Sequence, residues 1–401
     1  MLRPSGRTAV VTALALGAVV AATATAALAL SYVVGGNQHR LSVAPALAAP
    51  QLGHHHGTFK PDGTKLAGCT TAVCYEQAFG NVAYRRGPTT ALALFSYDIK
   101  TNRTVQDSCH RIAHTLGAAS LAHYHGDVYK ALAHGSFVCW SGYYHGVLEH
   151  ALGGVRTKAQ FAAVARHVCS GKLVRRTTWI AYQCVHGLGH GLMLQSGDNL
   201  PFALSVCDKL QTAWDRSSCS GGVFMENINA GSGLSQGTTR WLRKSDLVYP
   251  CDLVSSRHKL YCYLMVTSRI LQANGYDWTK AVQICDRVEK GWVSTCFQSF
   301  GRDADGYSVE RPSAVLRLCR LTGAHEGDCL YGAARDMTAD LSSGKRAAVL
   351  CARAPAGYRA RCFYGIGTIV GSFSASPSRG SAVCTALTRA YAAQCRRGTG
   401  A

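Results

Sequence analysis

Three pairs of potential metal ligands recur in this sequence, and the two members of each pair are four residues apart. The pairs are His110 and His114, His145 and Glu149, and His186 and His190. Residues at this spacing lie on one face of an α-helix, about one turn apart. Imidazole and carboxylate groups together suit divalent transition metals such as Zn, Fe or Cu. We therefore expect these six side chains to be metal ligands.

The number of candidate ligands leaves the nuclearity of such a centre open. A mononuclear zinc site uses three or four protein ligands, whereas six would also fill a two-metal site. Glu226, seven residues after Cys219, is a further candidate as an added carboxylate or a catalytic general base. The competing interpretation is that these histidines only form hydrogen bonds within packed helices.

The elements that must position these residues are revealed by the cysteines. The chain has 18 cysteines, and most form couples that recur along the sequence. The couples are Cys169 and Cys184, Cys207 and Cys219, Cys251 and Cys262, Cys285 and Cys296, Cys319 and Cys329, Cys351 and Cys362, and Cys384 and Cys395. From Cys262 onward the second members follow one another at steps of 34, 33, 33 and 33 residues. A period in this range is typical of helical-hairpin repeats, and we expect one disulfide in each couple.

The local pattern around each couple favours an all-α fold. An apolar segment of helical character ends at the first cysteine, a polar turn follows, and the second cysteine opens another apolar segment. A small residue recurs three positions after the second cysteine, which predicts close helix–helix contact there. These positions are Gly142, Gly187, Gly222, Ser299, Gly332 and Gly365. We expect an α-solenoid-like array of disulfide-stapled hairpins, with Cys69–Cys74 and Cys109–Cys139 as the remaining pairs.

The histidines are concentrated in the first part of this array. Ten of the 16 histidines fall within residues 109–190, although a helical repeat needs none for packing. His145 and His190 each follow the second cysteine of a couple by six residues. The equivalent positions of later repeats hold Met225, Ser268, Arg302, Arg335 and Thr368. Because equivalent positions of neighbouring repeats stack side by side, we expect His145 and His190 to converge from adjacent helices.

The N-terminal segment predicts where the protein resides. Arg3 and Arg7 precede an uncharged, Ala/Val/Leu-rich stretch from residue 8 to 37, long enough to span a bilayer. We expect residues 1–35 to be a signal-anchor transmembrane segment or a signal peptide, with the body of the protein outside the cytoplasm. Residues 36–66, which include the run His54 to His56, are expected to form a flexible linker. Residues 67–200 then form the His-rich helical region, and residues 201–401 the Cys-paired repeats.

Charge and motifs narrow the classes of function. The formal net charge of +20 favours anionic partners, such as a cell-envelope polymer or a peptide, but no basic run indicates nucleic-acid binding. The match of GLSQG at 233–237 to a nucleophile elbow lies in a Gly/Ser/Thr-rich insertion, which lacks the strand-to-helix context of that motif. We expect a membrane-anchored or secreted metal-binding protein, an enzyme of the hydrolytic or oxygen-activating kind. The alternative is a non-enzymatic solenoid that binds an anionic polymer or peptide.

Overall fold

The computed structural model describes residues 59–400, apart from residues 156, 233–238, 342 and 375. The chain divides into two units, 1–42 and 43–401, and all described residues belong to the second. The predicted signal or anchor segment 1–35, the His54–His56 run and the GLSQG motif lie outside the described residues. Within the described part, no helix is both long enough and apolar enough to cross a membrane.

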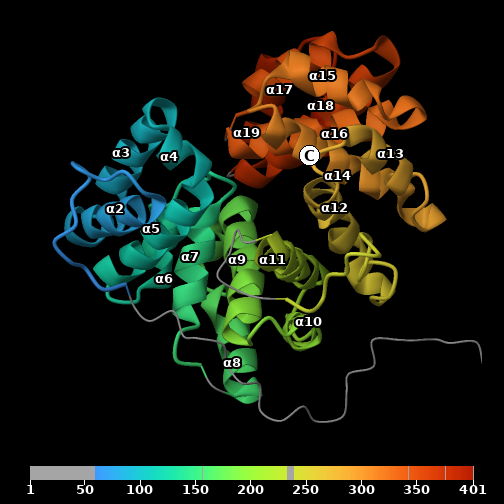
Figure 1. Ribbon diagram of the computed structural model, residues 1–401. Coiled ribbons are helices and arrows are strands. Elements are labelled where there is room, and N and C mark those ends of the chain that lie inside the picture. Colours follow the sequence, from blue (N-terminus) through green and yellow to red (C-terminus); the bar gives the residue numbers. More distant parts are fainter. Residues whose placement is uncertain (1–58, 156, 233–238, 342, 375, 401) are drawn as a thin grey trace, which may run out of the picture. The chain divides into compact units, whose positions relative to one another are not determined.

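The described part of the chain is all-helical, as the cysteine and hydrophobic patterns predict (Figure 1). It contains nineteen α-helices and three short 3-10 helices, and no strand among the described residues. In the first half the α-helices are α2 Ala72–Arg86, α3 Pro88–Thr101, α4 Arg103–Asp107, α5 Cys109–His123, α6 Val128–Ala133, α7 Gly142–Ala151, α8 Lys158–Val168, α9 Thr178–Gln195, α10 Leu200–Cys207 and α11 Ala213–Ser232. In the second half they are α12 Ser256–Ala273, α13 Trp278–Cys285, α14 Val293–Tyr307, α15 Pro312–Arg320, α16 Glu326–Asp340, α17 Gly344–Arg353, α18 Ala356–Phe373, α19 Pro377–Leu387 and α20 Ala392–Gly398.

The nine disulfides follow one another along the chain, each joining cysteines 5 to 30 residues apart. Every predicted couple is bonded, and the remaining four cysteines form Cys69–Cys74 and Cys109–Cys139, as expected. Cys319–Cys329, for example, ties the short helix α15 to the long helix α16. A bridge of this kind stabilises a fold by about 2–4 kcal/mol, mainly by restricting the unfolded chain. Nine such bonds are typical of proteins in an oxidising, extracytoplasmic compartment.

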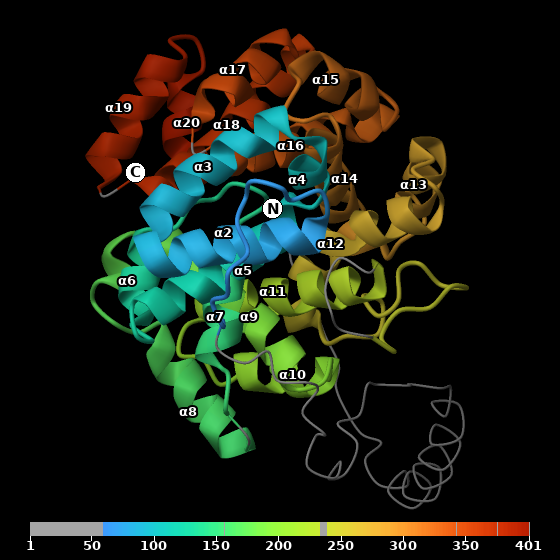
Figure 2. The ribbon, with the colours of Figure 1, turned by 60° about the vertical axis from the view of Figure 1, so that its left-hand side comes forward.

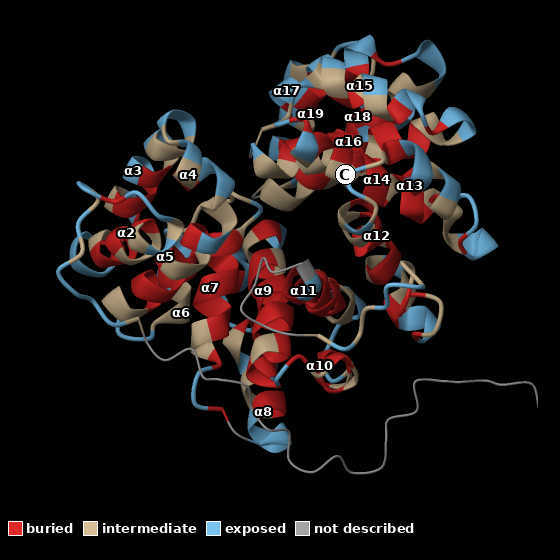
Figure 3. Ribbon diagram, in the orientation of Figure 1, coloured by how far each residue is buried: buried red, intermediate tan, exposed pale blue. Residues whose placement is uncertain are grey.

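The glycine-rich segment CVHGLGHGLM, residues 184–193, is helical throughout. It lies within α9, which begins after Thr177, whose side chain accepts a hydrogen bond from the Ile180 amide at 3.2 Å. Helix α9 is largely buried along its length (Figure 3). Tertiary packing therefore outweighs the cost of its three glycines, each about 1 kcal/mol relative to alanine in a helix interior.

A series of helices contact one another in chain order, namely α5, α7, α9, α11, α12, α14, α16, α18 and the short α20 (Figure 2). Several of these contacts are made backbone to backbone at glycines. A Cβ on Gly222 of α11 would overlap the His186 carbonyl oxygen of α9, and a Cβ on Gly189 of α9 would overlap the Cys219 carbonyl oxygen of α11. The predicted small-residue position at Gly222 is thus a point of close contact, and Gly189 completes the contact from the other helix.

The same reciprocal contact joins α5 to α7. A Cβ on Gly146 would overlap the His114 carbonyl oxygen, and one on Gly117 would overlap the Tyr143 carbonyl oxygen. Because of these contacts, side chains on the facing surfaces of α5, α7, α9 and α11 lie close enough to meet. Helix α9 also contacts α18, where the ring centroids of Trp179 and Phe373 are 4.7 Å apart.

Ahead of α2, the first described residues pack onto that helix. The Asn81 side-chain amide donates to the Asp62 carboxylate at 2.8 Å and to the Thr64 carbonyl at 2.9 Å. Hydrogen bonding to Asn81 and to the Thr64 backbone amide lowers the pKa of Asp62 to about 2. The end of the segment expected as a linker is therefore attached to the helical unit.

Replacing Gly222 with alanine is expected to destabilise the protein by about 1–3 kcal/mol, because the new methyl group cannot fit against the α9 backbone. Gly357, on α18, provides the control, since an added Cβ there would have no atom within 4 Å. Gly357→Ala should stabilise the helix by up to about 1 kcal/mol. Unfolding in denaturant with the disulfides intact measures both effects. Equal effects of the two substitutions would contradict the backbone contact.

Candidate metal centre

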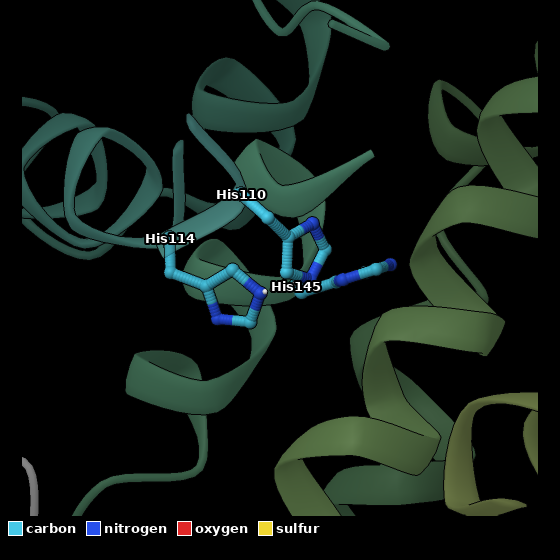
Figure 4. A group of neighbouring side chains, drawn as sticks. All are labelled: His110, His114 and His145. Carbon is cyan, nitrogen blue, oxygen red and sulfur yellow. Dashed lines mark hydrogen bonds between the residues drawn. The ribbon is translucent and has the colours of Figure 1, made fainter. Parts of the chain in front are cut away.

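The structure brings all six predicted ligands together, and Glu226 with them, where α5, α7, α9 and α11 pack side by side. Two of the histidines come from α5, one histidine and one glutamate from α7, two histidines from α9, and Glu226 from α11. Figure 4 shows the imidazole rings of His110 and His114 turned toward His145. We call these seven residues the His/Glu cluster.

His110 and His114 present two nitrogens to the same point. His110 Nδ1 donates to the Cys139 carbonyl oxygen at 2.7 Å, and His114 Nδ1 donates to the Glu149 carboxylate at 3.0 Å. Their Nε2 atoms then lie 3.1 Å apart. Two imidazole nitrogens bound to one zinc ion at about 2.0–2.1 Å would lie about 3.0–3.4 Å apart. Either a shared proton or a metal ion would satisfy this pair.

His145 lies at the centre of the cluster without a protein partner. It is 1% exposed, and neither its Nδ1 nor its Nε2 has a hydrogen-bond partner among the described residues. Its ring centroid is 5.5 Å from that of His110 and 5.3 Å from that of His114, and the ring stacks on His190 at 3.8 Å. Buried polar atoms nearly always find a partner in the protein, an ordered water or an ion.

The two carboxylates hold histidine rings by their Nδ1 atoms. Glu226, considered from the sequence as a further carboxylate or a general base, accepts a hydrogen bond from His190 Nδ1 at 2.7 Å. Both residues are fully buried, and His190 Nε2 has no partner in the described part of the chain. Glu149 accepts from His114 in the same way. A carboxylate on one ring nitrogen fixes the tautomer and leaves the other nitrogen available as a ligand.

Tyr182 lies against the His/Glu cluster, although its role was not predicted from the sequence. Its ring stacks on His186 with centroids 5.1 Å apart, and its hydroxyl lies 3.3 Å from His186 Nδ1. Tyr182, His186 and His190 follow one another at four-residue steps along α9, so the same periodicity that marked the histidines would have included the tyrosine.

Four of the five histidines of the cluster have lowered pKa values, which favour the neutral imidazole. Burial and the neighbouring His114 lower the pKa of His110 to about 3, and burial with the charge of Arg302 lowers that of His186 to about 4. The pKa values of His145 and His190 are held well below their usual range by burial and by nearby histidines. Burial also opposes the charged form of His114, but the Glu149 carboxylate outweighs it and raises the pKa. Neutral imidazole is the form that binds metal.

Three other residues in or next to these helices are exposed and do not belong to the cluster. His125 is exposed in a turn with a positive φ of 53°. Asp107 pairs with Arg103 at 2.8 Å on the surface. Trp140 is 47% exposed, although its ring centroid is 6.1 Å from that of His110.

The donor atoms of the cluster fall into three groups, within each of which all the atoms are 4.8 Å or less apart. The groups are His110, His114 and His145; His145, His186 and His190; and Glu149, His190 and Glu226. Because His145 belongs to two of them, the arrangement fits either one metal ion or two. No family model, curated protein or solved structure matches the chain. Its function must therefore be derived from the atoms of the site itself.

Replacing His145 with leucine should have opposite effects on the metal-free and metal-loaded protein. Without metal, the substitution removes two buried nitrogens that have no partner and should stabilise the fold by about 1 kcal/mol, net of the lost stacking on His190. With metal, it should weaken binding and so lower stability. Thermal unfolding before and after chelation measures both. Equal destabilisation in the two states would identify His145 as a packing residue.

Proposed function

We propose that this protein is an extracytoplasmic metal-binding protein whose His/Glu cluster holds one or two divalent transition-metal ions. The observation that carries the proposal is the set of three buried nitrogens with no partner among the described residues, namely both nitrogens of His145 and Nε2 of His190. A shared proton can satisfy the His110–His114 pair, whereas none of these three atoms has a hydrogen-bond partner among the described residues with which to share one. A neutral imidazole has one N–H and one lone pair, so His145 and His190 each offer one lone pair to a metal ion.

We assign different roles to the histidines and the glutamates of the cluster: the histidines bind the metal, and the glutamates orient histidine rings. The histidines supply nitrogen ligands, and Glu149 and Glu226 hold the Nδ1–H groups of His114 and His190. Glu149 remains a candidate direct ligand, since it also groups with His190 and Glu226. A set rich in imidazole suits Zn, Fe or Cu better than Mg or Ca. Bound zinc would supply Lewis-acid chemistry for hydrolysis, and iron or copper would supply redox chemistry for oxygen activation.

The proposal also includes a location and an architecture. Nine disulfides support an oxidising compartment, and an N-terminal anchor or secretion signal at residues 1–35 would deliver the protein there. We further propose that the disulfide-closed hairpins form a solenoid-like array, supported by the contacts of successive long helices. In that array the N-terminal hairpins would carry the metal centre.

The competing function is binding of an anionic polymer without catalysis. The net charge of +20 favours it. Many of the arginines and lysines lie in the cysteine-paired region, residues 201–401. Under this alternative the histidines would be incidental, and binding would depend on salt but not on metal.

Metal analysis of protein without an affinity tag should give one to two equivalents of transition metal per chain. To avoid competition from the N-terminal run, His54, His55 and His56 are replaced with alanine in all samples. The double substitution His145→Ala and His190→Ala should then reduce the metal content several-fold. The matched control removes two exposed histidines outside the cluster, His134→Ala and His167→Ala, and should leave the metal content unchanged.

A metal content near zero in the unsubstituted cluster, or an equal loss in both double variants, would contradict the proposed centre. Binding to an anionic polymer such as polyphosphate separates the two functions. The metal-centre proposal predicts that chelation removes the metal-dependent stabilisation. Salt-sensitive polymer binding that survives chelation, in protein without bound metal, would support the competing function instead.

A further inference from the structure

A second group of potential ligands lies outside the His/Glu cluster, on α14 and α16. It consists of Asp305, on α14, and Asp336 and Asp340, four residues apart on α16. One carboxylate oxygen from each residue lies within 4.8 Å of the others. These three residues, which we call the Asp cluster, offer oxygen atoms only.

Asp305 is a fully buried carboxylate, and neither of its oxygens has a hydrogen-bond partner among the described residues. A carboxylate can accept up to four hydrogen bonds, and a buried one without any is costly. Since its oxygens lie beside those of Asp336 and Asp340, the missing partner must also suit two further carboxylates.

The nearby arginines partly offset the negative charge of the Asp cluster but make their contacts with other groups. Arg302 pairs with Asp303 at 2.9 Å, and Arg346 donates to the Glu310 carbonyl oxygen at 3.4 Å. Arg335 places its guanidinium over the Tyr331 ring, 5.6 Å from the centroid. Within the described part of the chain, no arginine, lysine or histidine nitrogen forms an ion pair with the Asp cluster within 4.0 Å. Glu310, which acts electrostatically on all three aspartates, adds further negative charge.

Backbone contact between the two helices makes this arrangement possible. A Cβ on Gly301 of α14 would overlap the Cys329 carbonyl oxygen of α16, and a Cβ on Gly332 would overlap the Gln298 carbonyl oxygen. The disulfides Cys285–Cys296 and Cys319–Cys329 tie both helices to their hairpin partners. The carboxylates are thus held together by the fold despite their mutual repulsion.

We propose that the Asp cluster binds a hard divalent cation, with Ca²⁺ as the principal candidate. Ca²⁺ binds six to eight oxygen ligands at about 2.3–2.6 Å, and three carboxylates supply up to six oxygens. Two oxygens on opposite sides of such an ion would be about 4.6–5.2 Å apart, which is compatible with the spacing of the cluster. Carboxylate oxygens without imidazole or thiolate do not select the transition metals proposed for the His/Glu cluster.

The competing account is that protons neutralise the aspartates. Burial and mutual repulsion raise the pKa of Asp336 to about 7 and raise those of Asp305 and Asp340 well above the usual range. Protonated carboxyl groups would hydrogen-bond to one another and would need no cation. The two accounts differ in the response to added Ca²⁺ at neutral pH.

The experiment uses the full chain after chelation, with Ca²⁺, Mg²⁺ or Mn²⁺ added separately, and follows the Tm and the heat of binding. Ca²⁺ should raise the Tm in a saturable way at about one equivalent per chain. Asp305→Asn, which keeps the shape of the side chain, should raise the Tm of the cation-free protein and weaken Ca²⁺ binding by about 10-fold or more. Asp286→Asn, at an exposed site directly after α13, removes the same charge and should leave binding unchanged.

The response should persist in His145→Leu, so the Asp cluster and the His/Glu cluster can fail independently. A response to Mg²⁺ or Mn²⁺ in place of Ca²⁺, lost in Asp305→Asn, would support the site and change only the ion. No response to any of the three cations would overturn the proposal in favour of shared protons. An equal response in the unsubstituted protein and Asp305→Asn would also overturn it.

Discussion

Contact between helix backbones is the constraint on which the rest of this structure depends. Helices with ordinary side chains at their contact lie about 8–10 Å apart, too far for short polar side chains to gather several donors at one point. Glycines let the helices approach more closely at α5–α7 and α9–α11, where Gly146 and Gly222 face carbonyl oxygens of the neighbouring helix. The imidazoles of three successive helices then meet. The convergence of the donor atoms in the His/Glu cluster thus depends on glycines at the helix contacts.

The same helix packing brings different side chains together in the earlier and the later helices. Six residues after the second cysteine, the early repeats have His145 and His190, whereas two later ones have Arg302 and Arg335. The later helices α14 and α16 repeat the reciprocal glycine contact, but it brings carboxylates together there. A disulfide closes the hairpins of both regions, whether imidazoles or carboxylates face the helix contact. A scaffold of this kind tolerates buried polar groups because covalent bonds offset part of their cost.

Cysteine spacing predicted the disulfides and the all-α fold because a 33-residue period leaves few alternatives. Four-residue spacing predicted which histidines share a helix face, and equivalent repeat positions predicted that His145 and His190 meet. The roles of Glu149 and Glu226 as partners of histidine Nδ1 atoms could not be predicted, because they depend on the rotation of each helix about its axis. The Asp cluster was missed for a related reason: Asp305 and Asp336 occupy different repeat positions, nine and seven residues after their cysteines. Only the packing of α14 on α16 brings them together.

Anomalous-difference diffraction from crystals of the tag-free protein, measured on both sides of the Zn, Fe and Cu absorption edges, tests the central claim most directly. It locates a metal and identifies the element without any substitution in the chain. The account predicts a peak among α5, α7 and α9, within about 2.0–2.3 Å of a nitrogen of His145. Ordered water in contact with His145 and no anomalous peak among these helices, in crystals grown with transition metal present, would contradict it.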